Sequence, residues 1–158
     1  MISDPRSRMG ANMKILVDAD ACPVNRIVEV IAKEKNISLI FICDKNHVIR
    51  SEFGDVVTVE SGPDAVDFKI IEIGKKGDLV VTQDYGVAAM ALGKGMFAVH
   101  QSGKEFTDYN IDSLLMERHL SKKARRVGRQ NGKGPSKRTQ HDDELFEKLF
   151  LSILNRII

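Results

Sequence analysis

Short apolar and β-branched runs alternate along the chain with longer segments whose apolar residues recur at helical spacing. The runs typical of buried strands are 15–17, 37–43, 56–59, 79–82 and 96–100. The segments with helical spacing are 23–36, 64–75, 87–92, 110–120 and 140–155. Strands that alternate with helices form βαβ units. The pattern therefore predicts an α/β fold with a mostly parallel sheet of four or five strands flanked by helices.

The length of the chain fits a single domain. We expect residues 13–158 to fold together. Residues 1–12 show no periodicity before a second methionine, so we expect a disordered leader or a cloning remnant there. No apolar stretch approaches the roughly 20 residues that span a bilayer. Cys22 and Cys43 form neither a disulfide framework nor a zinc motif. These features predict a cytoplasmic protein with no membrane partner.

Basic residues are concentrated in the segment 118–138. It holds nine of the 24 Lys and Arg residues and no acidic residue, which leaves 15 basic and 22 acidic residues elsewhere. Such a run, broken by glycines, could follow a phosphate backbone, or it could be a solvated helix face and a loop. On the first interpretation the partner is a nucleic acid, with RNA expected. The candidate contacts are Lys122, Lys123, Arg125, Arg126, Arg129, Lys133, Lys137 and Arg138.

The candidate chemistry lies where predicted strands end in acids. Asp18 follows the first apolar run, and Asp84 closely follows the fourth. In open parallel sheets, ligands bind at the carboxyl ends of neighbouring strands whose connections run in opposite directions. If these two strands are neighbours, Asp18 and Asp84 meet there, and Asp20 could face the same crevice. Carboxylates held so close repel each other unless a cation lies between them.

A further acid comes from the predicted helix 64–75, in which Asp64 and Asp67 share one face. Several carboxylates in one cleft are typical of a Mg²⁺ or Mn²⁺ site, and such an ion can promote phosphodiester cleavage. Some acids also have a purely structural alternative. Asp64, Asp142 and Asp143 stand at predicted helix starts, where aspartate commonly caps the helix.

Other reactive side chains give weaker signals. Cys22 lies beside a predicted helix start, where a thiol can be activated, but its acidic neighbours favour a packed, protonated thiol. The four histidines show no mutual spacing typical of a metal site. The last helix has a broad apolar face, which we expect to pack mainly within the chain. An oligomer is therefore possible but not indicated.

Three motifs stand in a distinctive order. They are Asp-Ala-Asp-Ala-Cys-Pro-Val at 18–24, Thr-Gln-Asp-Tyr at 82–85, and Gly134-Pro135 leading to Asp142 and Phe146. Together they resemble the uncharacterised YaiI/YqxD family of bacterial proteins, over Met13 to Leu154. That family looks related to PIN-like domains, many of which are metal-dependent ribonucleases. The resemblance implies a three-layer PIN-like sandwich with a central parallel sheet.

The resemblance also implies roles for individual acids. In PIN-like domains an Asp ends the first strand and a Thr/Ser-x-Asp ends the fourth, which match Asp18 and Asp84 here. A middle helix supplies a further acid, best matched by Asp67, so Asp18, Asp67 and Asp84 would bind the metal. The chain departs from the pattern at two positions. Phe68 stands where another acid is frequent, and Gly86 stands where proline usually follows Asp-Tyr.

Three functions are consistent with these features. The first is a Mg²⁺- or Mn²⁺-dependent nuclease acting on RNA, whose candidate catalytic residues are Asp18, Asp20, Asp67 and Asp84. The second is a phosphatase of the haloacid dehalogenase type, with Asp18 as nucleophile and Asp20 as general acid. The third is a non-catalytic nucleic-acid-binding module that retains the metal site. RNA cleavage, a trapped phosphoaspartate, and RNA binding without turnover would distinguish them.

Overall fold

The computed structural model describes residues 13–20, 22–62, 64–126 and 137–158. The leader at 1–12 and the candidate contacts Arg129 and Lys133 lie outside these ranges, and the side chains of Arg125 and Arg126 are also not described. In chain order the elements are β1 (Lys14–Asp18), α2 (Asn25–Lys35), β2 (Ser38–Asp44), β3 (Asp55–Val59), α3 (Ala65–Ile73), β4 (Leu79–Val81), α4 (Tyr85–Gly93), β5 (Phe97–His100), β6 (Lys104–Phe106), α5 (Ile111–Arg126) and α6 (Gln140–Ile157).

The strands form one six-stranded sheet in the order β3-β2-β1-β4-β5-β6. The first five are parallel, which confirms the predicted α/β fold with a mostly parallel sheet. The count of four or five strands was too low, because β6 pairs antiparallel with β5. This strand has three residues and no apolar periodicity, and a tight turn at Gly103 (φ 90°) creates the hairpin.

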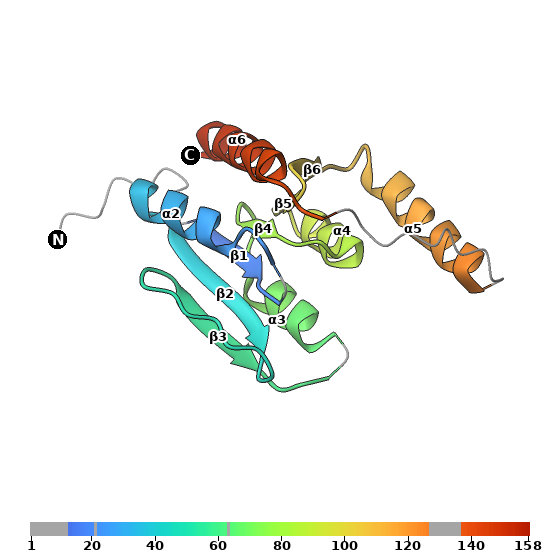
Figure 1. Cartoon of the computed structure of the whole chain (residues 1–158), viewed down its shortest axis with the longest axis horizontal. Helices are drawn as coiled ribbons and strands as arrows, with labels where there is room; N and C mark the ends of the chain where they lie inside the picture. The colour runs from blue at the N-terminus through green and yellow to red at the C-terminus, as the bar shows by residue number, and fades with distance from the viewer. Residues whose placement is uncertain (1–12, 21, 63, 127–136) are drawn as a thin grey trace.

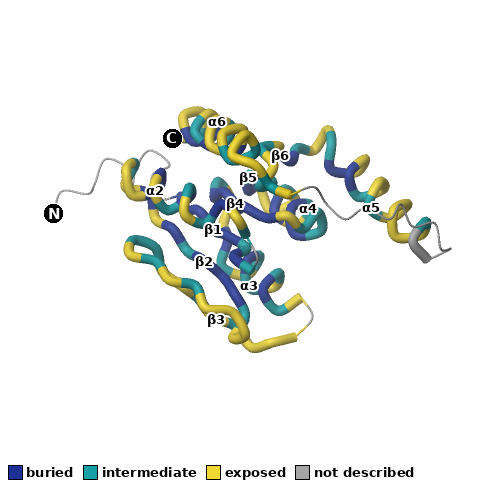
Figure 2. Tube along the Cα trace, in the orientation of Figure 1, coloured by how far each residue is buried: buried dark blue, intermediate teal, exposed yellow. Residues whose placement is uncertain are grey.

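The helices lie on both faces of the sheet (Figure 1), which gives the three layers. Ile15 and Val17 pack into the core under α2 and α6, whereas Leu16 packs into the core under α3, α4 and α5. Successive side chains of a strand point to opposite faces, so a strand covered on both sides is apolar throughout. Figure 2 shows this buried interior along the central strands.

The apolar face of α6 packs within the chain, as expected. Phe146, Phe150, Ile153 and Leu154 are all buried in the same core cluster as α2 and β1, and the two phenylalanine rings stack with centroids 5.3 Å apart. None of the helices in the described ranges is both long enough and apolar enough to cross a membrane.

Asp142 and Asp64, which both stand at predicted helix starts, differ in the contacts they make. Thr139 is the N-cap of α6, and Asp142 completes a capping box with it as the third residue of the helix, so Asp142 has a structural role at this helix start. Asp64 precedes α3, but its side chain makes no capping hydrogen bond and its backbone is left-handed (φ 63°). An effective N-cap has an extended backbone that directs its side chain to the first-turn N–H groups. The expected cap at Asp64 was therefore wrong.

Strands β1 and β4 are neighbours, paired through Val17 and Val81. From β1 the chain proceeds to β2 and β3 on one side, and from β4 it proceeds to β5 on the other. The connections thus reverse direction between β1 and β4. The carboxyl ends of these two strands are where a ligand site is expected in such a sheet.

Candidate functional site

A buried hydroxyl connects the ends of β1 and β4. The Thr82 Oγ1 atom donates a hydrogen bond to Asp18 Oδ2 (2.9 Å) and accepts one from the Asp84 backbone N–H (3.0 Å). Thr82 is only 2% exposed. Asp18 is the last residue of β1, and Thr82 directly follows β4. The structure therefore brings Asp18 and Asp84 together, as the strand-end argument predicted.

Asp84 also caps helix α4. Its Oδ1 atom accepts hydrogen bonds from the N–H groups of Gly86 (2.7 Å) and Val87 (3.2 Å). The same oxygen lies 3.4 Å from Nη1 of Arg118, which extends from α5. These contacts fix the carboxylate through one oxygen. The other oxygen, Oδ2, accepts no hydrogen bond from any residue that the structure describes.

Asp67, in the first turn of α3, completes a group of three acids. Burial, followed by the negative charges of Asp84 and Asp18, raises the pKa of Asp67 to about 6. Burial also raises the pKa of Asp18 to about 6; the Thr82 hydrogen bond opposes this rise, and the charges of Asp20 and Asp84 add to it. The charge of Asp84 is thus close enough to Asp18 and Asp67 to oppose the ionisation of both, and Asp18 acts on Asp67 in the same way.

This arrangement fits a divalent cation. Three carboxylates supply the oxygen ligands that Mg²⁺ and Mn²⁺ prefer. Burial and the neighbouring carboxylate charges raise the pKa values of Asp18 and Asp67, and a bound cation would favour the ionised form of both against these effects. Asp18 is held through Oδ2, as Asp84 is held through Oδ1, so each keeps one oxygen that accepts no hydrogen bond within the described ranges. The donor types of Asp18, Asp67 and Asp84 therefore suit such an ion, whereas the described residues whose ligand atoms already lie within 4.8 Å of one another are Asp20, Asp44 and His47.

Asp20 belongs to a neighbouring group. Its Oδ1 atom lies 3.3 Å from Nδ1 of His47, and the same ring nitrogen lies 2.8 Å from Oδ1 of Asp44. The sequence did not point to Asp44 or His47, although Asp44 ends β2 just as Asp18 ends β1. Applying the strand-end argument to the second strand would have found Asp44. His47 requires the turn that follows, in which its N–H donates to the Asp44 carbonyl.

The basic candidates differ in their surroundings. Lys122 and Lys123 are exposed on α5, and Lys137 is exposed before α6. Arg138 is engaged within the chain: its Nε donates to Asp143 Oδ1 (2.7 Å) and its Nη2 to the Gln101 carbonyl (2.9 Å). The two lysines on α5 are therefore the accessible part of the basic segment nearest to Arg118 and the acids.

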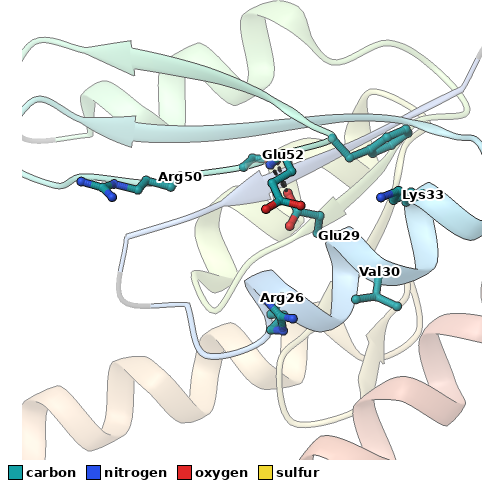
Figure 3. Close-up of a pocket in the computed structure, with 8 residues that line it drawn as sticks. Arg26, Glu29, Val30, Lys33, Arg50 and Glu52 are labelled. Atoms are coloured by element: carbon teal, nitrogen blue, oxygen red, sulfur yellow. Dashed lines mark hydrogen bonds between the residues drawn. The ribbon is translucent and has the colours of Figure 1, made fainter.

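A hollow of about 290 Å³ lies beside Asp84. It is lined by Gln83, Tyr85, Glu117, Arg118 and Ser121, from the turn before α4 and from α5. A second pocket, of about 530 Å³, lies between α2 and residues 50–53 (Figure 3), and none of the three acids lines it. The three acids do not line the smaller hollow either, but Gln83 and Tyr85 flank Asp84 in the sequence and Arg118 contacts its carboxylate, so this hollow adjoins the candidate site.

The thiol of Cys22 is not activated. Burial raises the pKa of Cys22 to about 11, and the nearby charge of Asp18 adds to this shift. A thiol with this pKa is protonated at neutral pH and is a poor nucleophile. The interpretation of Cys22 as a packed thiol agrees with this environment.

Comparison with known proteins identifies relatives along nearly the whole chain. The model of the "Uncharacterized BCR, YaiI/YqxD family" matches residues 16–156. A UPF0178 protein of Clostridium acetobutylicum is 56% identical over 145 residues, covering 91% of this chain and 98% of the relative. A UPF0178 protein of Lachnoclostridium phytofermentans is 50% identical over 147 residues, covering 92% of this chain and 99% of the relative.

Among solved structures, that of a point mutant of Rae1 (YacP) from Bacillus subtilis aligns with 92% of this chain and 100% of that chain. The two share 15% sequence identity, with a TM-score of 0.34. The family model and the bacterial relatives are decisive, because each covers far more than half of the sequence. The chain belongs to the YaiI/YqxD family.

Proposed function

We propose that the protein is a Mg²⁺- or Mn²⁺-dependent nuclease that cleaves RNA phosphodiesters in the bacterial cytoplasm. The observation that carries this proposal is the convergence of Asp18, Asp67 and Asp84 where the sheet connections reverse. Structural carboxylates are usually dispersed or paired with cations. Two carboxylates with raised pKa values beside a third carboxylate, as Asp18 and Asp67 are beside Asp84, are typical of a functional site.

In this proposal Asp18, Asp67 and Asp84 hold the ion. When bound, the ion stabilises negative charge on the phosphodiester oxygens and favours ionisation of an attacking water. Thr82 keeps Asp18 and the Asp84 backbone in a fixed relative position through its two hydrogen bonds. Because the hydroxyl is buried and bonded on both sides, the acids need little rearrangement before reaction.

The substrate would cross the hollow beside Asp84. Arg118 lines that hollow, and Lys122 lies one helical turn further along α5. Side chains four residues apart lie on the same face of a helix, so these two cations form a row that leads away from the acids. A row of this kind supports binding of a phosphate backbone without selecting a base sequence.

The phosphatase alternative receives less support from the geometry. It requires Asp20 to act as a general acid beside Asp18. The Oδ1 atom of Asp20 is instead directed toward His47, at the end of the neighbouring strand. A phosphoaspartate trapped with beryllium fluoride would nevertheless favour the phosphatase over the nuclease, so this measurement accompanies the test below.

The decisive test is cleavage of labelled single-stranded and hairpin RNAs, with Mn²⁺ and Mg²⁺ titrated. We expect metal-dependent cleavage by the wild type and its loss in Asp18→Asn and Asp84→Asn, with Asp55→Asn as a control. Asp55 is an exposed aspartate at the opposite end of a strand. Calorimetry on the same proteins measures metal binding independently of RNA cleavage. A variant that loses only cleavage can then be distinguished from one that also loses the metal. RNA that stays intact while metal binds contradicts the nuclease and favours the binding module.

The path of the RNA is tested by salt dependence. Replacing Lys122 and Lys123 with glutamine should weaken binding to single-stranded RNA and lower the slope of log K against log salt by about 0.7 per lost phosphate contact. The matched control replaces Lys75 and Lys76, an exposed lysine pair that precedes β4. Equal slopes for both double variants would show that α5 does not contact the RNA backbone.

A further inference from the structure

The carboxyl ends of β1 and β2 place Asp20 opposite Asp44. These parallel strands pair Asp18 with Ile42, and the Ala19 N–H still bonds to the Ile42 carbonyl at 3.0 Å. Extending that register by two residues aligns Asp20 with Asp44. Because successive side chains of a strand alternate between the two faces of the sheet, Asp20 and Asp44 lie on the same face as Asp18 and Ile42. The loop after β2 then brings His47 back to the pair, through the bond between its N–H and the Asp44 carbonyl (3.1 Å).

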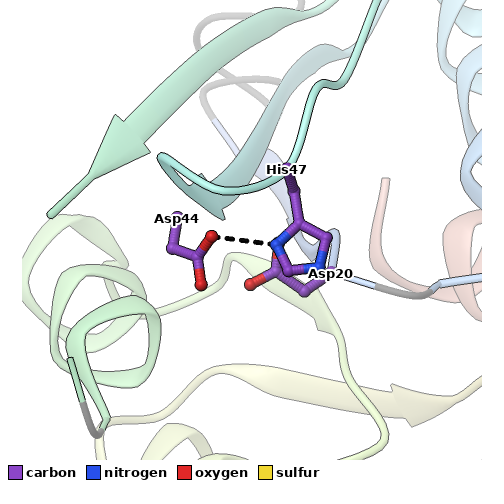
Figure 4. A group of neighbouring side chains, drawn as sticks. All are labelled: Asp20, Asp44 and His47. Atoms are coloured by element: carbon purple, nitrogen blue, oxygen red, sulfur yellow. Dashed lines mark hydrogen bonds and ion pairs between the residues drawn. The ribbon is translucent and has the colours of Figure 1, made fainter. Parts of the chain in front are cut away.

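The three side chains converge on a small volume (Figure 4). One ligand atom from each of Asp20, Asp44 and His47 lies within 4.8 Å of the others. The His47 Nδ1 atom stands 2.8 Å from the Asp44 oxygen and 3.3 Å from the Asp20 oxygen. The Asn46 N–H donates to Asp44 Oδ1 at 2.8 Å, which orients that carboxylate. Two carboxylates and an imidazole are therefore already gathered in a conformation that a metal ion could use.

A second observation concerns the hydrogen bonding of the Asp20 carboxylate. The Oδ1 atom of Asp20 is shielded from solvent, yet it accepts no hydrogen bond from any residue in the described ranges. A buried carboxylate oxygen without a donor is unfavourable, and such groups normally have a partner. The His47 Nδ1 atom lies 3.3 Å from this oxygen, within ion-pair distance when the ring is protonated, but the contact is not a hydrogen bond. A cation bound between the three ligand atoms would satisfy the oxygen.

We propose that Asp20, Asp44 and His47 form a second metal site, separate from the Asp18–Asp67–Asp84 site, that takes a divalent transition-metal ion. The donor set determines the class of ion. An imidazole nitrogen is a ligand for Zn²⁺ and other transition metals, whereas Mg²⁺ and Ca²⁺ prefer oxygen donors alone. Three protein ligands leave positions for solvent, and the half-exposed His47 side chain leaves the ion accessible. The ion would take the place of the proton on His47 Nδ1 while Nε2 keeps or gains one, so a proton is released to solvent only when the ring starts as an imidazolium.

Zn²⁺ is the probe of choice because it has strong affinity for sites that contain an imidazole. Calorimetric titration of the full chain with Zn²⁺ is expected to show a site that His47→Gln and Asp44→Asn each weaken by at least about tenfold. Glutamine has no donor atom at the Nδ1 position, and asparagine removes the charge of Asp44 with little change in size. X-ray absorption of the bound Zn²⁺ should show one imidazole nitrogen among light-atom ligands.

Matched controls separate this site from the rest of the surface and from the proposed nuclease site. His119→Gln and Asp55→Asn alter an exposed histidine and an exposed aspartate and should leave Zn²⁺ affinity unchanged. Asp84→Asn should also keep the Zn²⁺ site, even though it is expected to abolish RNA cleavage. Failure of the nuclease proposal therefore leaves this test intact.

The result that would overturn the second site is an identical Zn²⁺ titration for wild type, His47→Gln and Asp44→Asn. Because a variant could simply unfold, thermal unfolding with and without Zn²⁺ is measured in parallel. We expect Zn²⁺ to raise the melting temperature of the wild type and of Asp84→Asn but not of His47→Gln. A Zn²⁺-dependent rise of equal size in all three proteins also contradicts the assignment.

Discussion

The small side chain of Thr82 links the ends of β1 and β4, the two strands of the candidate site. Its hydroxyl donates to Asp18 on β1 and accepts from the backbone of Asp84 after β4, and it is shielded from water. Valine has nearly the same shape but can make neither bond. Removing one partner of a buried hydrogen bond leaves the other group without compensation for its lost hydration.

We therefore expect Thr82→Val to lower the free energy of unfolding by about 1–3 kcal/mol and to weaken Mn²⁺ binding. Thr82→Ser, which keeps the hydroxyl, should retain most of both properties. Urea unfolding and calorimetry on the three proteins provide the measurements. A valine variant with wild-type stability and wild-type Mn²⁺ affinity would contradict the positioning role of this hydroxyl.

Asp18 makes the stability of the metal-free protein depend on pH. Its pKa is about 6 in the folded chain and near 3.8 when unfolded, so the folded state holds the proton more tightly between these values. The contribution of Asp18 to stability is therefore present below about pH 4 and is lost as the pH rises through 6. Asparagine cannot ionise. Relative to wild type, Asp18→Asn should gain roughly 2 kcal/mol between pH 4 and pH 7.

Urea unfolding in the presence of EDTA at several pH values measures this difference. Asp55→Asn, a change at an exposed aspartate, should show a flat difference from wild type over the same range. Saturating Mn²⁺ should reduce the advantage of Asp18→Asn at pH 7, because the ion compensates the carboxylate charge. A pH-independent difference for Asp18→Asn would mean that its surroundings do not oppose ionisation.

At the scale of single elements, helix α4 begins at a residue that also belongs to the candidate metal site. Asp84 Oδ1 accepts hydrogen bonds from two N–H groups of the first turn, Gly86 and Val87. Its second oxygen remains available to a ligand. Helix capping requires only an acceptor atom, whereas cation binding requires the negative charge, so substitution can separate the two roles.

Asp84→Asn should retain the acceptor and most of the stability but lose Mn²⁺ binding. Asp84→Ala should lose Mn²⁺ binding as well and unfold with a free energy about 1 kcal/mol below that of Asp84→Asn. Urea unfolding and calorimetry of both variants check this pair. If alanine and asparagine are equally stable, the carboxylate does not contribute to the start of α4.

The helices and parallel strands could be predicted because each carries its own apolar period. Helix ends were harder to predict. Asp64 has a residue type suited to capping, but the left-handed backbone that precedes α3 prevents this role, and a residue type does not reveal a backbone dihedral angle. The three residues of β6 carry no period; they pair because Gly103 turns the chain back on β5 and packs against the backbone of α6.

For the whole molecule, the strand-end argument was enough to bring Asp18 and Asp84 to one edge of the sheet, because parallel strands end together, whereas Asp67 on helix α3 was matched through the resemblance to PIN-like domains. The pairing of Asp20 with His47 was not predictable from spacing, since it depends on the turn after β2. The relation to PIN-like domains and the binding of RNA stay predictions. The membership in the YaiI/YqxD family was predicted from the motifs and is confirmed by the relatives.

Helix α6 covers the part of the core that lies against β1 and α2. Phe150 on this helix is fully buried against residues of β1 and α2, whereas Leu145 on the same helix is 43% exposed. Phe150→Ala should lower the free energy of unfolding by about 3–5 kcal/mol. Leu145→Ala should change it by less than about 1 kcal/mol. Similar losses for both variants in urea unfolding would mean that α6 does not close the core.

The position of α6 in the sequence has a consequence for biosynthesis. A ribosome releases the strands first, so the sheet can assemble while its last covering helix is still being made. During that interval the apolar face of β1 and β2 that α6 will cover is open to water and to other nascent chains. Translation that stops before α6 therefore yields an aggregation-prone product with an exposed apolar sheet face, which chaperones and proteases can recognise.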